Sequence, residues 1–161
     1  MQFTRTNKAA SIVAVLALFV TGVAAQGTKH QFCQPVGGML MTNLGAVDQA
    51  TTMGSATGDL KGAVGATILS TESNGNTLVL NVQHHWVTDA GDTLAIAPAT
   101  ATTTQVAPGL YAVVTYPAHL SGGTGRYAHA TGDFTNIGEA DLNTGHIVLR
   151  YSGQICFMGG D

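Results

Sequence analysis

Turn signals recur at short spacing along the chain after residue 26, and no stretch between them has the period of a helix. The turn sequences are Asn74-Gly75-Asn76, Asp89-Ala90-Gly91-Asp92, Pro108-Gly109, Gly122-Gly123 and Asn143-Thr144-Gly145. The runs between them are rich in threonine, valine and glycine, and we predict strands at 37–44, 52–59, 62–70, 77–88, 93–104, 109–119, 127–135, 137–142 and 146–157. Short strands at this spacing predict an all-β fold, either a sandwich or a barrel.

Residues 1–25 have the pattern of a secretory signal peptide. Two basic residues precede a short apolar stretch, and a Val-Ala-Ala ending suits cleavage after residue 25. The alternative is a membrane anchor, but the apolar run 12–20 is about half of the roughly 20 residues that a bilayer span requires. We therefore expect a signal peptide at 1–25, a single β-barrel domain at 26–161, and a secreted or periplasmic protein.

The expected mature protein is acidic and weakly charged. The whole chain has six Lys and Arg residues against nine Asp and Glu, and two of the basic residues lie in the signal segment. The remainder therefore has a formal net charge of −5, which removes the electrostatic basis for a nucleic-acid partner. The 45% share of hydrophobic residues excludes an intrinsically disordered chain. No second apolar run is long enough to predict a membrane span after signal cleavage.

Cys33 and Cys156 are the only cysteines, and they lie near the two ends of the expected domain. In an oxidising compartment such a pair favours a disulfide. The bond requires the two Cα atoms to lie within about 7 Å, so the first and last strands must be near neighbours, as in a closed barrel. The alternative is a redox or nucleophilic cysteine, which neither a Cys-x-x-Cys spacing nor an obvious nearby base supports.

The stretch 122–132 has the sequence Gly-Gly-Thr-Gly-Arg-Tyr-Ala-His-Ala-Thr-Gly. It resembles a recurrent element of the allene oxide cyclase-like and dirigent-like barrel superfamily, and Gly91-Asp92-Thr93-Leu94 and Tyr151-Ser152-Gly153 are similar to parts of its small exported bacterial members. The resemblance covers about residues 50–157. It implies a closed antiparallel β-barrel of about eight strands with an internal cavity, assembled as a homotrimer. It assigns no catalytic residue, because the polar cavity positions of those proteins have no motif match in this chain.

The glycine-rich stretch has a second interpretation, as a phosphate-binding loop. It lacks the Lys-[Ser/Thr] ending and the following helix that such a loop requires, so a corner of the barrel is favoured. A separate internal similarity links Ala56-Thr57-Gly58-Asp59-Leu60 with Ala130-Thr131-Gly132-Asp133-Phe134. We interpret these segments as two similar hairpins, in which Asp59 and Asp133 accept turn N–H groups.

The histidines are the candidate metal ligands: His30, His84, His85, His119, His129 and His146. His84 and His85 are adjacent, so on a strand they point to opposite faces and cannot bind one ion together. His119 and His129 flank the glycine corner but have no evident third ligand. Surface histidines are therefore the favoured interpretation, and we expect no metal and no cofactor.

Glu139 and Asp141 are a second candidate pair, because they lie two residues apart on one face of a predicted strand. Paired carboxylates carry out acid–base chemistry when burial raises the pKa of one of them. Their neighbours Ala140 and Leu142 have the pattern of buried residues, which favours a solvated face for the two acids. The chain also lacks the Gly-x-Ser-x-Gly elbow of a serine hydrolase.

The predicted strand 77–88 contains the main candidates for ligand binding. One of its faces carries Leu78, Leu80, Val82, His84 and Trp86. We interpret this as an inward face that is packed at its apolar start and opens at a mouth lined by His84 and Trp86, with Tyr116 or Tyr151 lining the same space. Such a mouth suits a mostly apolar molecule with one oxygenated end. The alternative is a core tryptophan with a hydrogen-bonded histidine beside it.

Three hypotheses for the function are ranked in order, and the third, a metal-dependent reaction, has only the number of histidines to support it. The first is a non-catalytic exported barrel that binds a small apolar or oxygenated molecule or serves a structural role. The second is a cyclase or isomerase of the allene oxide cyclase type that steers a substrate inside the barrel by shape and by exclusion of water. An open cavity lined by His84 favours the second hypothesis, and a filled interior contradicts it.

Overall fold

The computed structural model describes residues 30–159, and the predicted signal peptide at 1–25 lies outside these residues. The elements are β1 Gln31–Leu44, β2 Thr51–Ala56, η1 Gly58–Leu60, β3 Gly62–Asn74, β4 Thr77–Thr88, β5 Leu94–Ile96, β6 Ala99–Ala107, β7 Leu110–Thr115, β8 Pro117–Gly123, η2 Gly125–Tyr127, β9 Thr131–Asp141 and β10 His146–Met158. The predicted strand 77–88 coincides with β4, whereas β1 begins before the predicted start at residue 37.

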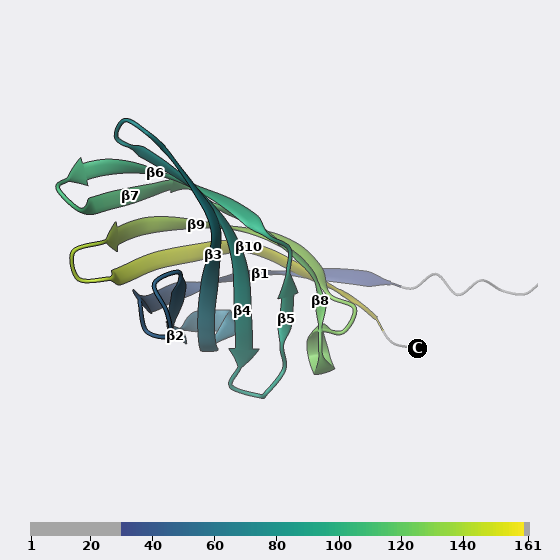
Figure 1. The fold of residues 1–161 in the computed structure, drawn as a ribbon. Helices are drawn as coiled ribbons and strands as arrows, with labels where there is room; N and C mark the ends of the chain where they lie inside the picture. Colours follow the sequence, from purple (N-terminus) through teal and green to yellow (C-terminus); the bar gives the residue numbers. More distant parts are fainter. Residues whose placement is uncertain (1–29, 160–161) are drawn as a thin grey trace, which may run out of the picture.

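The strands form an antiparallel sheet that closes into a ring (Figure 1). Hydrogen-bonded neighbours follow the order β1, β2, β3, β4, β6, β7, β9 and β10, and β10 pairs again with β1. The two other strands extend the wall at one end, because β5 leads into β6, β7 leads into β8, and β8 pairs with both β5 and β9. The fold is therefore a closed antiparallel barrel of eight strands, which confirms the barrel and excludes the sandwich.

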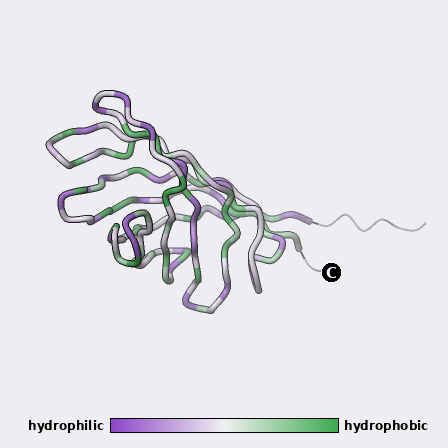
Figure 2. The backbone as a smooth tube through the Cα atoms, in the orientation of Figure 1, coloured by the Kyte–Doolittle hydropathy of each residue, from purple (hydrophilic) through white to green (hydrophobic). Residues whose placement is uncertain are grey.

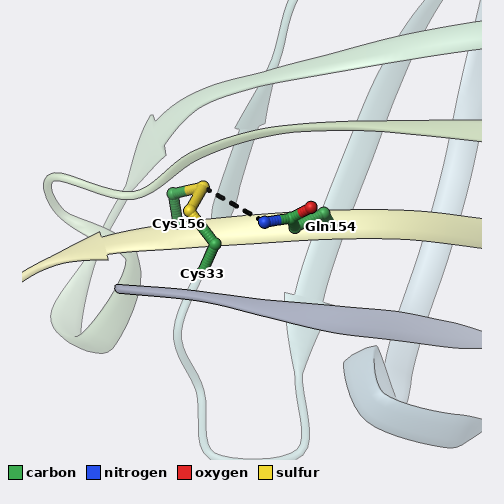
Figure 3. The surroundings of a disulfide bond; sticks show 3 residues. All are labelled: Cys33, Gln154 and Cys156. Carbon is green, nitrogen blue, oxygen red and sulfur yellow. Dashed lines mark hydrogen bonds between the residues drawn. A yellow bond between two sulfur atoms is a disulfide. The ribbon is translucent and has the colours of Figure 1, made fainter. Parts of the chain in front are cut away.

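The seam between β1 and β10 closes the ring. Their register sets Cys33 directly opposite Cys156, with Cα atoms 3.9 Å apart, and the two sulfurs form the predicted disulfide (Figure 3). The side-chain amide of Gln154 lies 4.0 Å from the Cys156 sulfur. Next to the disulfide, the rings of Phe32 and Phe157 stack with their centroids 5.3 Å apart. The first and last strands are thus joined by hydrogen bonds, a covalent bond and an aromatic contact.

Aromatic and aliphatic side chains fill the end of the barrel that carries the disulfide. Trp86, Phe134 and Tyr151 meet edge to face, with ring centroids between 5.7 and 6.3 Å apart. Leu120 and Ile155 in the same core are fully buried. Figure 2 shows hydrophobic and hydrophilic residues interleaved along the strands, as expected for walls that face a core on one side and solvent on the other. We call the end of the barrel that contains Trp86, Phe134, Tyr151, Leu120 and Ile155 the packed end.

Two short turns of the same kind cover the packed end. Thr57-Gly58-Asp59-Leu60 and Thr124-Gly125-Arg126-Tyr127 each begin with an extended threonine, at φ of −116° and −115°, followed by a glycine at φ of 84° and 51°. Each threonine hydroxyl accepts a backbone N–H from a neighbouring segment. Each turn buries its last side chain, Leu60 or Tyr127. The glycine is required because other residues rarely adopt these positive φ angles.

The predicted similarity between 56–60 and 130–134 does not correspond to two similar hairpins. The first segment contains η1, whereas the second begins the regular strand β9 and pairs with β10. The Asp59 carboxylate accepts the backbone N–H of Gly37 on β1 at 2.8 Å, so it joins the turn to the barrel wall rather than closing the turn. The two similar sequences therefore have different structures. Residues 58–60 form a 3-10 turn outside the sheet, whereas residues 131–134 pair with β10 within it.

Candidate functional site

A cavity of about 80 Å³ lies inside the barrel. Every strand of the eight-stranded ring contributes to its wall, which is mostly aliphatic and contains no Asp, Glu, Lys or Arg. The lining residues are Leu40, Thr42, Thr52, Val64, Gly65, Ala66, Ile68, Leu80, Val82, His84, Ala101, Thr103, Val113, Tyr116, Ala140, Ile147 and Leu149. The volume exceeds the roughly 10–15 Å³ that one water molecule needs and is below that of most drug-sized sites, so the cavity suits a small molecule.

The cavity lies toward the hairpin turns that connect β1 to β2, β3 to β4, β6 to β7 and β9 to β10. The strands that these turns connect can be followed in Figure 1. Along the inner face of β4, Leu80, Val82 and His84 line it, and Trp86 lies beyond them in the packed end. The prediction that the barrel is packed at the start of β4 and opens at Trp86 is therefore wrong. The apolar start of β4 lines the cavity, and the Trp86 indole is buried in the packed end. The reason is η1, which covers Trp86 and which strand periodicity does not reveal.

His84 and Tyr116 form the polar floor of the cavity. His84 Nε2 and Tyr116 Oη are 2.8 Å apart and share a hydrogen bond, and the two rings stack with centroids 5.4 Å apart. Each residue has an exposed fraction of only 7%. The structure thus brings together two of the four predicted ligand-binding residues, one from the middle of β4 and one from the junction between β7 and β8.

Burial keeps both members of the polar floor neutral. Loss of hydration lowers the pKa of His84 to about 4, with a smaller contribution from the neighbouring His85. Loss of hydration also raises the pKa of the Tyr116 hydroxyl well above its usual value of 10. At pH 7 the cavity therefore offers neutral hydrogen-bonding groups in an apolar wall.

A β-bulge turns Tyr116 into the barrel. The register between β6 and β7 shifts at Val114, so this residue is an extra one on its strand. Val114 and Thr115 are both exposed, and the buried residues on either side of them are Val113 and Tyr116. Strict alternation would set Val113 and Tyr116 on opposite faces, so the bulge is what brings both into the cavity wall.

Asn136 is a buried polar residue that the sequence interpretation missed. It is fully buried on β9, and both its backbone N–H and its side-chain amide donate to the carbonyl oxygen of Tyr116, at 2.9 and 3.2 Å. It therefore holds the backbone of Tyr116 where β7 ends and β8 begins. The sequence contained one signal for this residue. Asn136 lies between Phe134 and Ala140 on the inward face of β9, and a polar side chain buried there needs a hydrogen-bond partner.

Trp86 and Tyr151 stabilise the packed end and do not line the cavity. The Trp86 indole N–H donates to the carbonyl oxygen of Leu60 at 2.8 Å. The Tyr151 hydroxyl donates to the carbonyl oxygen of Thr57 at 2.8 Å and accepts the backbone N–H of Leu60 at 2.9 Å. Both polar groups thus fix the η1 turn, and the core alternative describes Trp86 correctly.

The other histidine candidates, His30, His85, His119, His129 and His146, are all exposed. His85 Nε2 is 3.0 Å from the Thr67 hydroxyl, on the face of β4 opposite to His84. His119 Nδ1 is 2.8 Å from the Asp133 carboxylate, and both side chains are mostly exposed. Within residues 30–159 no group of three or more His, Cys, Asp or Glu side chains lies close enough to hold a metal ion.

Glu139 and Asp141 do not form a carboxylate pair for catalysis. Glu139 is exposed, and the Asp141 carboxylate accepts the Thr144 hydroxyl and the Asn143 backbone N–H, both at 2.9 Å. These hydrogen bonds, with that of Thr144 first, lower the pKa of Asp141, the opposite of what a general acid needs. Leu142 is exposed in the turn after β9, so its predicted burial is wrong.

No helix within residues 30–159 has the length and apolarity needed to cross a membrane. The chain matches no model of a known protein family and no curated protein sequence. The resemblance to allene oxide cyclase-like barrels therefore stays a prediction from the motifs, and the candidate site stands on its own geometry.

Proposed function

We propose that this protein is an exported barrel that binds a small, mostly apolar molecule with one oxygenated end. The observation that carries the proposal is the cavity inside the ring, whose aliphatic wall ends at a neutral histidine–tyrosine pair. Small-ligand sites commonly combine an apolar wall with a few convergent polar groups that fix the orientation of the ligand. Export is proposed from the signal-like sequence at 1–25, and the disulfide between Cys33 and Cys156 is compatible with it.

A cyclase or isomerase of the allene oxide cyclase type is the second candidate. The enclosed His84–Tyr116 pair favours it, because such a reaction needs orientation and exclusion of water more than charged groups. General acid–base catalysis works best when the pKa of the catalytic group lies near the working pH. The pKa of His84 is near 4 and that of Tyr116 is raised, so both groups are poorly matched to proton transfer at neutral pH. We therefore rank binding above catalysis.

Titration of the secreted protein with cyclopentanone, followed by methyl NMR, tests the binding proposal. We expect saturable shifts of the methyl signals of Val82, Val113 and Leu149, which line the cavity. The variant Ala101→Leu fills the cavity from β6 and should abolish the shifts. Thr100→Leu adds a similar volume on the exposed face of the same strand and should leave them unchanged. Persistence of the shifts in Ala101→Leu, or shifts confined to outer-wall methyls, would contradict the proposal.

A further inference from the structure

The hydrogen bond of the polar floor has two possible polarities, and they leave different groups without a partner. In the first, the Tyr116 hydroxyl donates to His84 Nε2, and the neutral imidazole carries its hydrogen on Nδ1. In the second, His84 carries its hydrogen on Nε2 and donates it to Tyr116 Oη, and Nδ1 has only a lone pair. The hydrogen of the phenol is then available for another acceptor.

The surroundings of His84 Nδ1 favour the second polarity. This atom is buried and has no hydrogen-bond partner among the described residues. In proteins, a buried N–H without a partner is rarer than a buried acceptor with an unused lone pair. The imidazole has only one hydrogen at neutral pH, and placing it on Nε2 gives it the Tyr116 oxygen and leaves only a lone pair at the sealed Nδ1. The donor left without a partner is then the Tyr116 O–H, which lines the cavity, where a ligand can accept its hydrogen.

We propose that the Tyr116 hydroxyl donates a hydrogen bond to the ligand and that the ligand is a neutral carbonyl compound whose oxygen accepts this bond. Tyr116 lines the cavity, and its oxygen already receives a hydrogen from His84, which orients the remaining O–H toward other acceptors. Among the threonines in the wall, Thr103 does not compete as a donor to the ligand, because its hydroxyl already donates to the carbonyl oxygen of Leu78. A carboxylate ligand is disfavoured, because the wall offers no cation to pair with it.

The tautomer of His84 tests the donor assignment without any ligand. Nitrogen-15 NMR of the imidazole distinguishes a protonated nitrogen from an unprotonated one. We expect the hydrogen on Nε2 and an unprotonated Nδ1 at pH 7. A hydrogen on Nδ1 would overturn the assignment, because the Tyr116 hydroxyl would then be committed to His84.

A matched pair of probes tests the ligand class, which rests on the proposed function. Cyclopentanone and methylenecyclopentane have nearly the same shape, but only the ketone accepts a strong hydrogen bond. We expect Tyr116→Phe to weaken binding of cyclopentanone about tenfold and to leave that of methylenecyclopentane unchanged. Tyr127→Phe makes the same chemical change in the packed end, outside the cavity, and should affect neither probe.

The outcomes separate the two proposals. Equal weakening of both probes by Tyr116→Phe, or no weakening of the ketone, would overturn the donor role of Tyr116 while leaving the cavity as a binding site. Failure of the unmodified protein to bind either probe would instead reject the proposed function together with the ligand class. In that case the His84 tautomer still decides the polarity of the hydrogen bond.

Discussion

Two buried residues that each leave one polar atom unpaired contact Tyr116 in the interior of the barrel. The side-chain atoms that residues 30–159 bury without a hydrogen bond are His84 Nδ1, Thr88 Oγ1 and Asn136 Oδ1. His84 and Asn136 both contact Tyr116, one through the phenol and the other through the backbone carbonyl. Each unpaired buried group costs about 1–3 kcal/mol, and folded proteins pair most of them. Of these residues only His84 lines the cavity, so its unpaired atom supports a role of the His84–Tyr116 pair in binding.

The buried His84 should make the stability of the protein depend on pH. Its pKa is about 4 in the folded protein and near 6.5 when unfolded, so the unfolded chain binds more protons between these values. The free energy of unfolding should therefore fall as the pH decreases from 6.5 to 4, by up to about 3 kcal/mol from this group. Denaturant titrations at pH 7 and pH 4 measure the change.

The matched variants for this test are His84→Gln and His85→Gln. We expect the first to remove most of the pH dependence between 4 and 6.5, because the titrating group is gone. The second should keep it, since His85 is exposed on the outer face of the same strand. An unchanged pH dependence in His84→Gln would show that the histidine is not buried as described.

Strand β1 approaches its neighbours closely where it passes the η1 turn. A Cβ at Gly38 would overlap the carbonyl oxygen of Thr57 and would come within 2.7 Å of the Tyr151 ring. A Cβ at Gly37, on the other face of the strand, would meet only the carbonyl oxygen of Tyr151 at an ordinary 3.5 Å. Glycine at position 38 is therefore required by space, whereas the neighbouring glycine is not.

Adjacent alanine substitutions should separate these two glycines. We expect Gly38→Ala to lower the free energy of unfolding by about 1–3 kcal/mol, because β1 and the η1 turn must move apart. Gly37→Ala should change it by less than about 1 kcal/mol and keeps the N–H that bonds to Asp59. Thermal or denaturant unfolding measures both effects, and similar losses in the two variants would contradict the described packing.

The sequence predicts the strands better than it predicts which side chains share the cavity. Alternation on β4 sets His84 and Trp86 inward, as the structure shows, because that strand is regular up to its end. Alternation fails on β7, since the bulge at Val114 reverses the faces and brings Tyr116 beside His84. Bulges and short 3-10 turns depend on contacts between distant segments, and a local pattern does not contain them.

The interior of the whole barrel has two parts, the packed end and the half that contains the cavity. The disulfide joins residues 123 positions apart, and a loop of that size stabilises the fold by about 4–5 kcal/mol in the chain-entropy model. The disulfide lies at the packed end of the β1–β10 seam, and the other end of the same seam forms part of the cavity wall. Homotrimer formation, implied by the resemblance, stays a prediction.

Xenon provides a direct test for an accessible apolar cavity above the His84–Tyr116 pair. Xenon enters apolar cavities and is easily located in a crystal by its electron density. In a crystal of the purified protein under xenon pressure, we expect a xenon site among Val82, Val113 and Leu149. A fully packed interior without xenon at that place, while the crystal remains ordered, would show that the barrel has no such cavity.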